Sequence, residues 1–272
     1  MFAILVKYHC MCYTIYKDFI RGDIKMQEQR YIKIKDKKER LSFLEILHNN
    51  GYSFDNYTKE DIVNSIFPIA VNLKNKTICM IGNVTCAAAA STQNVLEDIN
   101  SFFCNRAKWY INELLQDEKI VQNVQIYTIE NIHNNYDIIP NDHGVYFIFD
   151  LGNTEINFSN KIGNIRNEYR GKSLLYDTEK LQNKYNNGDK TILYIGKADG
   201  KKGLKQRLTD YIEYGYCKNK AHRGGRAIWQ INNNKQLGVC WIKNINAKEL
   251  ETKLIAKYKD YYNVFPVANW RK

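Results

Sequence analysis

Two nearly unbroken apolar segments in the second half of the chain set the strongest limit on its fold. GVYFIFDL begins at Gly144 and TILYIG begins at Thr191, and neither alternates apolar with polar residues. Short continuous apolar runs are typical of strands that are buried on both faces. We therefore expect both segments to be buried strands.

The segments around these strands indicate two domains. Residues 155–190, rich in Asn and Lys, read as an insertion with one short helix near 173–185. Residues 131–142 are polar and contain Pro140 and Asn141, which favour turns, so we place the domain boundary there.

The preceding part, residues 26–130, reads as a small α+β accessory module. A helix is expected over 37–49, two strands joined by a polar turn over 66–83, and a further helix from a Thr85 cap to about Phe103. The apolar face of the first helix would comprise Leu41, Phe43, Leu44, Ile46 and Leu47.

The N-terminus does not resemble a targeting segment. Lys7 and His9 interrupt its apolar run, and no basic region precedes that run, so we expect a cytoplasmic protein without a membrane partner. Met26 opens a more ordinary start, and residues 1–25 read as an extension or an over-extended reading frame.

The cysteines give no sign of a disulfide framework or a zinc site. They are odd in number and contain no CxxC pair: Cys10, Cys12, Cys79, Cys86, Cys104, Cys217 and Cys240. We expect most of them to be reduced and buried.

The net positive charge of the chain comes entirely from its second half. Residues 1–140 contain 16 Lys and Arg against 16 Asp and Glu, whereas residues 141–272 contain 24 against 13. A polyanion is the expected partner of the second half, although a surplus that serves only solubility stays open.

The stretch 191–212 reads as a strand, a Lys- and Gly-rich turn, and an amphipathic helix. Arg207 and Tyr211 are four residues apart and therefore neighbours on one helix face. Lysines surround this turn, and a corner whose lysines are merely solvated is one interpretation of it.

Five elements appear in a fixed order along the second half. They are Gly144-Val145-Tyr146, Tyr194-Ile195-Gly196, Arg207, Glu251 and Asn269. In this order they resemble the GIY-YIG nuclease family over roughly residues 141–272. The resemblance implies a small, mostly antiparallel sheet flanked by helices, and a hydrolase that cuts DNA with Mg²⁺ or Mn²⁺.

The resemblance also implies a role for each residue. Glu251 would bind the metal, Arg207 would hold phosphate oxygens, and Tyr146 or Tyr194 would act as general base. A phenol is a poor base at neutral pH unless a cation stabilises the phenolate, and Lys197 is a candidate for that role. Strand aromatics and a surface ion pair remain the structural alternatives.

The chain departs from the family pattern at several points. Tyr146 and Tyr194 are 48 positions apart, whereas the family usually carries its signatures on one short hairpin, so the insertion must loop out to contact DNA or cap the site. Tyr211 stands where many members have a histidine, and His222 is a candidate replacement. Glu249 and Asn263 are alternatives to the family's glutamate and asparagine.

The segment HRGGRAIW is a candidate phosphate-binding loop. Two arginines flank a Gly-Gly pair that lets the backbone approach a ligand closely. The expected nucleic-acid contacts are Lys201, Lys202, Lys205, Arg223 and Arg226.

Three functions therefore compete. The first is a DNA endonuclease, for which a homodimer is left open. The second is an inactive nucleic-acid-binding module of the same fold, because Tyr211 replaces the usual histidine. The third is a basic protein-interaction domain with the tyrosines in its core.

Overall fold

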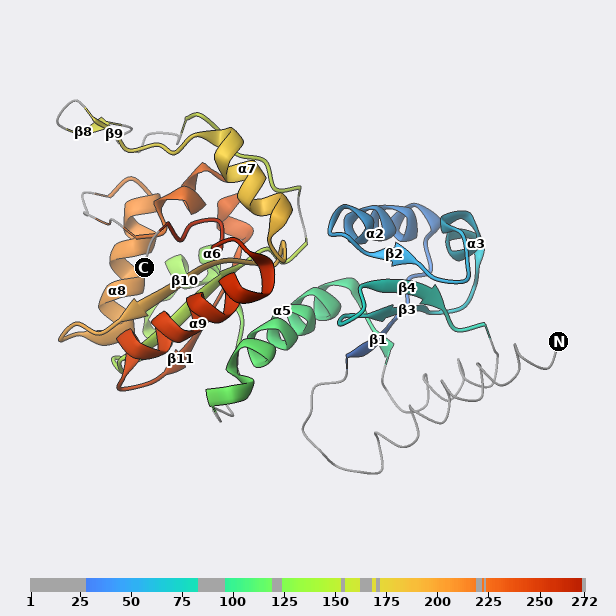
Figure 1. Cartoon of the computed structure of the whole chain (residues 1–272), viewed down its shortest axis with the longest axis horizontal. Helices are drawn as coiled ribbons and strands as arrows, with labels where there is room; N and C mark the ends of the chain where they lie inside the picture. The colour runs from blue at the N-terminus through green and yellow to red at the C-terminus, as the bar shows by residue number, and fades with distance from the viewer. Residues whose placement is uncertain are drawn as a thin grey trace. The chain divides into compact units, whose positions relative to one another are not determined.

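The computed structural model describes residues 28–82, 96–118, 124–152, 155–161, 168–169, 172–218, 222 and 224–270. The chain divides into two compact units, Met1–Phe102 (unit 1) and Phe103–Lys272 (unit 2), and its fold class is α+β (Figure 1). The expected extension, residues 1–25, lies outside the described residues.

Unit 1 is built on one sheet with the strand order β2-β4-β3-β1-β5. The strands are β1 (Gln29–Ile32), β2 (Ser53–Phe54), β3 (Ile69–Asn72), β4 (Thr77–Met80) and β5 (Leu96–Glu97). Helices α2 (Lys37–Asn49) and α3 (Lys59–Asn64) pack against each other. The predicted helix over 37–49 and the predicted pair of strands, antiparallel β3 and β4, are both confirmed.

Helix α2 begins after Asp36, whose side chain accepts a hydrogen bond from the Glu39 amide at 2.8 Å. Phe43, Leu44 and Leu47 are buried as expected. The prediction was wrong for Leu41, which is 36% exposed. The buried Arg40 next to it donates hydrogen bonds to three backbone carbonyls, those of Ile34, Ile62 and Phe67.

The helix expected from Thr85 to Phe103 is wrong over residues 96–98 and confirmed over residues 99–103. Leu96 and Glu97 form β5, which pairs in parallel with β1, and α5 (Ile99–Leu115) begins after it. The Asp98 carboxylate accepts from the Ser101 amide at 2.8 Å, which starts the helix there. Residues 83–95 lie outside the described residues.

Unit 2 contains a second sheet with the order β10-β7-β11-β6, in which every pairing is antiparallel. Its strands are β6 (Tyr127–Thr128), β7 (Gly144–Phe149), β10 (Ile192–Ala198) and β11 (Gly238–Lys243). Its helices are α6 (Ile129–Asn134), α7 (Thr178–Asn187), α8 (Gly203–Gly215) and α9 (Ala247–Tyr262). The short 3-10 helices are η1 (Gln116–Glu118), η2 (Tyr136–Ile138), η3 (Arg226–Gln230) and η4 (Asn234–Gln236).

The two apolar segments are the central β7 and its neighbour β10, and every residue of β7 is buried. Helices α8 and α9 both pack against these two strands. The insertion contributes α7 and a two-stranded hairpin, β8 (Glu168–Tyr169) and β9 (Lys172–Ser173), drawn at the far end of unit 2 from the sheet (Figure 1). Its helix starts later than expected because the Asp177 side chain caps it.

The two units divide between Phe102 and Phe103 and not within residues 131–142. Strand β6 pairs with β11, and α6 packs against α8, so the stretch that contains them belongs to unit 2. Its polar composition reflects a capped helix and a 3-10 turn at the surface of a domain.

None of the helices in the described ranges combines the length and apolar character needed to cross a bilayer. The four described cysteines are free thiols. Cys240 is buried, Cys79 and Cys104 are half-buried, and Cys217 is exposed. Burial raises the pKa of Cys79 to about 11, which makes it a poor nucleophile.

Candidate active site

The two signature tyrosines meet on one face of the sheet. Gly196 of β10 lies directly opposite Tyr146 of β7, so Tyr194 is the diagonal neighbour of Tyr146. The ring centroids are 5.8 Å apart at an interplanar angle of 64°. The separation of 48 positions in sequence therefore leaves the two signatures on adjacent antiparallel strands.

Gly196 is required between these rings. A Cβ at this position would lie 2.5 Å from Cζ of Tyr146 and 2.7 Å from Cε1 of Tyr194. Both rings are buried, so neither can swing away into solvent. The glycine of the second signature thus sets the spacing of the tyrosine pair.

Arg207 of α8 is the cation beside the two tyrosines. Burial raises the pKa of Tyr146 and of Tyr194, and the guanidinium of Arg207 opposes that rise. Burial alone would lower the pKa of Arg207, but the two phenols raise it overall. Both phenols consequently hold their protons at neutral pH and can donate hydrogen bonds.

Several polar atoms of this cluster are buried without a hydrogen-bond partner among the described residues. They are Oη of Tyr146, Nε of Arg207, both ring nitrogens of His222 and Nε of Arg226. Buried polar groups are almost always paired in folded proteins, and exceptions concentrate where a ligand completes the set. An oxygen-rich ligand would supply the partners that these atoms lack.

Tyr211 has a structural role. Its hydroxyl donates to the Gly225 carbonyl at 3.0 Å, and its ring lies 6.2 Å from the Tyr194 ring and 5.0 Å from the Trp229 ring. Burial raises its pKa well above the usual value. It therefore does not supply the basic nitrogen found at this position in the family it resembles.

His222 does approach the cluster from the following loop. Its ring packs edge-on against Tyr211 at a centroid distance of 4.8 Å and is 4% exposed. Burial, reinforced by the charge of Arg207, lowers the pKa of His222 to about 3. The imidazole is therefore neutral at neutral pH, and it can accept a hydrogen bond but is a weak base.

The Gly-Gly pair lies against the protein's own tyrosine. A Cβ at Gly224 would lie 2.6 Å from Oη of Tyr194, and one at Gly225 would lie 2.8 Å from Cε1 of the same ring. Gly225 also has a φ of +67°, which favours glycine. The expectation that these glycines make room for a ligand is corrected: they make room for Tyr194.

The flanking arginines differ in what the structure describes. The Arg226 guanidinium lies over the Tyr176 ring at 5.7 Å. Tyr176 in turn stacks on Trp270 at 4.6 Å. Arg223 lies outside the described residues.

Glu251 is the acidic residue that acts on the site. It is half-buried on α9, and its charge adds to the burial that raises the pKa of Tyr146 and Tyr194. The alternative, Glu249, is exposed and forms a 3.2 Å ion pair with Lys253. Within the described ranges no three His, Cys, Asp or Glu residues gather closely enough to hold a metal.

Asn269 fastens the second signature strand. Its Oδ1 accepts from the Ile195 amide at 3.0 Å, and its Nδ2 donates to the Ile195 carbonyl at 2.8 Å. Both ends of the amide are engaged with the backbone of β10, so in this structure Asn269 positions the strand that carries Tyr194. Asn263 ends α9 in a left-handed conformation, with a φ of 57°.

Lys197 does not act on the phenols. Side chains alternate along β10, so Lys197 points to the face opposite Tyr194. Its ammonium forms an ion pair with Asp199. The expected stabilisation of a phenolate by Lys197 is corrected, because Arg207 occupies that position.

Three predicted lysines line a pocket of about 440 Å³ at the start of α8. It is lined by Tyr136, Asn141, Lys201, Lys202, Lys205, Gln206 and Thr209. The first amides of α8 are already used, since Leu204 donates to the Asp142 carbonyl and Lys205 to that of Pro140. Any phosphate contact at this turn therefore falls to the lysine side chains.

Sequence reasoning missed Gln230, which fastens the insertion. Its side chain accepts from the Tyr176 amide at 2.7 Å and donates to the carbonyls of Tyr176 and Ser159 at 2.8 and 3.1 Å. Gln230 is 1% exposed. No local signal distinguishes it, because its partners lie 54 and 71 positions away.

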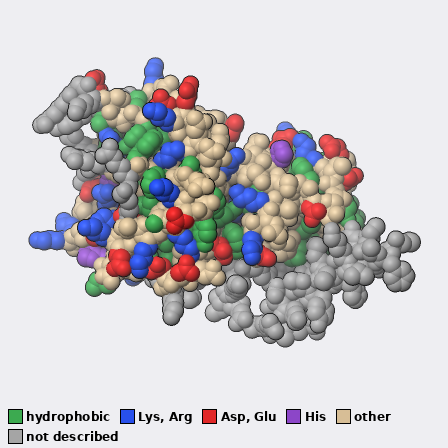
Figure 2. All heavy atoms as spheres, in the orientation of Figure 1, with side chains coloured by type: hydrophobic (Ala, Val, Ile, Leu, Met, Phe, Trp, Pro, Cys, Tyr) green, Lys and Arg blue, Asp and Glu red, His purple; other side chains and the backbone are tan. Residues whose placement is uncertain are grey.

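One face of unit 2 carries charges of both signs. On the face drawn in Figure 2, its Lys and Arg side chains lie among Asp and Glu side chains.

Compared with known protein families, curated proteins and solved structures, the chain matches none. The assignment of the site accordingly depends on its geometry.

Proposed function

We propose that the chain is a divalent-metal-dependent endonuclease that hydrolyses DNA phosphodiester bonds in unit 2, as in the GIY-YIG family that it resembles. The observation that supports this most is the buried cluster of Tyr146, Tyr194 and Arg207, whose unpartnered Oη and Nε atoms suit phosphate oxygens. The enzyme would act in the cytoplasm, with unit 1 selecting the substrate.

The residues fit a single hard cation. Glu251 is one half-buried carboxylate near the phenols, and Mg²⁺ typically takes one or two carboxylates and completes its shell with water and phosphate oxygens. When bound, Mg²⁺ or Mn²⁺ would lower the pKa of a water molecule and neutralise charge on the phosphate.

The protein's own groups would divide the remaining work. Arg207 would hold two non-bridging phosphate oxygens, and the protonated phenols of Tyr146 and Tyr194 would donate hydrogen bonds to the same group. The neutral His222 would accept a hydrogen bond from the attacking water and orient it, since a pKa of about 3 makes the imidazole a poor general base. The lysines around the pocket would hold flanking phosphates and make binding depend on salt.

The test is a cleavage assay on supercoiled plasmid and on single-stranded DNA with Mg²⁺ or Mn²⁺. Glu251→Ala is expected to abolish metal-dependent cutting, whereas Glu249→Ala, a matched change on the same helix, should cut like the wild type. Equal cutting by wild type and Glu251→Ala would remove Glu251 from the proposal.

One observation favours a second function, an inactive nucleic-acid-binding module. Tyr211 replaces the family's histidine, and its hydroxyl is committed to the Gly225 carbonyl. This alternative predicts DNA binding that weakens with salt and no cleavage with either metal. The same plasmid assay, combined with a binding titration, separates the two.

A further inference from the structure

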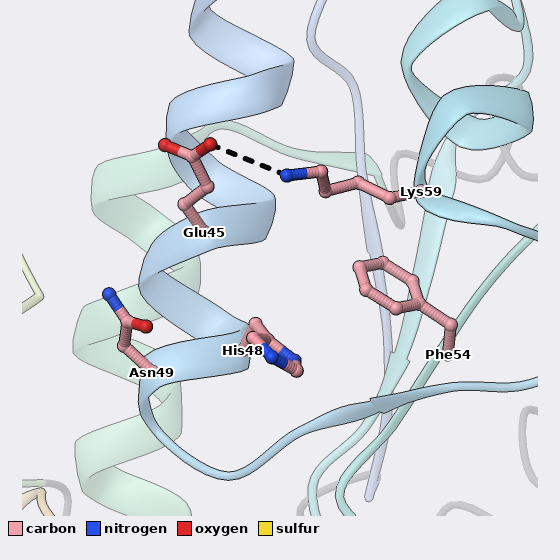
Figure 3. A pocket seen from close by; sticks show the side chains of 5 residues that line it. All are labelled: Glu45, His48, Asn49, Phe54 and Lys59. Carbon is pink, nitrogen blue, oxygen red and sulfur yellow. Dashed lines mark hydrogen bonds and ion pairs between the residues drawn. The ribbon is translucent and has the colours of Figure 1, made fainter.

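Unit 1 contains a pocket that the proposed chemistry does not use. It has a volume of about 430 Å³ and lies between α2 and the segment that leads from β2 into α3. It is lined by Glu45, His48, Asn49, Phe54 and Lys59 (Figure 3).

Two aromatic rings flank this pocket. The rings of His48 and Phe54 are 20° from parallel, with centroids 6.0 Å apart. That distance lies within the range of about 4.5–7 Å for aromatic pairs, so the two rings already stack on each other and a base would stack on an outer face of the pair. In Figure 3 they project toward each other from α2 and from β2. Such a pair offers two near-parallel faces to a flat ligand.

Both rings are held by ordered backbone. His48 Nδ1 lies 3.3 Å from the Tyr52 carbonyl and must donate to it, which leaves Nε2 as an acceptor. The Tyr52 amide donates to the Leu47 carbonyl, which fixes the turn after α2. Phe54 is paired with Ile78 of β4. The faces are therefore arranged before a ligand arrives, which lowers the entropic cost of binding.

The remaining groups supply donors and acceptors. The Glu45 carboxylate and the Lys59 ammonium form a 3.4 Å ion pair that joins α2 to α3 beside the rings (Figure 3). Glu45 is exposed and Lys59 is half-buried, and a pair of this kind is weak enough to open.

We propose that this pocket binds a nucleobase, stacked on the aromatic pair of His48 and Phe54 with its polar edge toward Glu45 and Lys59. Unstacked bases are typically bound in this way, by aromatic faces with hydrogen bonds to the base edge. That the base belongs to an unpaired nucleotide of a DNA strand rests on the proposed function. A free nucleotide has the same chemistry and is the other source.

The experiment uses the full chain with Glu251→Ala, so that no cutting interferes. A single-stranded oligonucleotide containing the fluorescent base 2-aminopurine is titrated with protein, and quenching reports stacking. Phe54→Ala and His48→Ala are each expected to weaken the quenched complex at least about fivefold, the lower end of the effect of losing one base–aromatic stack. Phe54→Leu keeps an apolar side chain but no aromatic face, and should show the same loss if Phe54→Ala unfolds unit 1.

Ile66→Ala is the matched control, since Ile66 is 92% exposed in the same unit and does not line the pocket. Quenching that is unchanged in all three pocket variants would overturn the proposal. Competition by nucleoside monophosphates as effective as that by unlabelled oligonucleotide would make a free nucleotide the ligand, and competition by the oligonucleotide alone would make it a strand. Failure of the nuclease is scored separately, as absence of cutting by the wild type.

Discussion

The side-chain amide of Asn269 forms two hydrogen bonds with the backbone of Ile195. Its Oδ1 accepts from the Ile195 amide, and its Nδ2 donates to the Ile195 carbonyl. Asn269→Ala would leave both Ile195 groups buried and unpaired. We expect the free energy of unfolding to fall by about 1–3 kcal/mol, measured by urea denaturation. Asn263→Gly is the control, because glycine accepts the left-handed backbone of that position, and its stability should stay near that of the wild type. Equal stability of the two variants would contradict the role given to Asn269.

Gly196 sets the gap between the signature tyrosines. Gly196→Ala would force a methyl group against both rings, and overpacking of this kind typically costs about 1–3 kcal/mol. Thermal unfolding should show that loss, together with reduced cleavage. Gly200→Ala is a matched change in the turn after β10, with nothing within 4 Å of the added Cβ, and it should behave as wild type. A Gly196→Ala protein as stable as Gly200→Ala would show that the rings move apart easily.

The planar guanidinium of Arg207 can donate two parallel hydrogen bonds to a phosphate group, which a lysine ammonium cannot do. In Arg207→Lys the charge remains but bidentate binding of phosphate oxygens is lost, so we expect the cleavage rate to fall by about 100-fold or more. Single-turnover kinetics measures this. Lys205→Arg, which keeps a charge beside the outer pocket, should cut at a near-normal rate. Cutting by Arg207→Lys within a few-fold of wild type would refute bidentate binding.

His222 makes stability depend on pH. Its pKa of about 3 in the folded protein lies below that of an unfolded histidine, about 6.5. Between these values the unfolded chain binds more protons, so the contribution of His222 to stability is present above pH 6.5 and is lost as pH falls toward 3. Urea denaturation at several pH values gives the free energy of unfolding as a function of pH. Between about pH 3 and 6.5 this free energy should rise less steeply with pH for His222→Gln than for wild type. Superimposable slopes would show that His222 is not buried as a neutral group.

Gln230, the last residue of η3, holds two segments of the insertion, one at Ser159 and one at Tyr176. Gln230→Ala should free the backbone groups of Ser159 and Tyr176 and expose the insertion to limited proteolysis. Gln236→Ala serves as the control, because Gln236 forms a single exposed contact with Glu130. Identical digestion rates for the two variants would mean that other contacts hold the insertion.

Local patterns were sufficient for some features and not for others. The buried strands β7 and β10 and helix α2 follow from apolar runs and a capping residue, which act over a few neighbours. The partner of Lys197, the fit of Gly224 and Gly225 against Tyr194, and the grip of Gln230 depend on residues brought together only by folding. Strand β5 shows the same limit, because its pairing with β1 overrides a local helix preference.

The double attachment at Gln230 also has a consequence for engineering. With Ser159 and Tyr176 fastened to one buried side chain, the chain between them closes a loop whose ends are fixed independently of its length. Lengthening such a loop costs little, because closure entropy grows only slowly with the number of residues. A peptide tag or a foreign binding segment inserted between these two residues should therefore leave the β7–β10 pairing intact. This makes the loop between Ser159 and Tyr176 a suitable insertion site for adding a new binding specificity to unit 2.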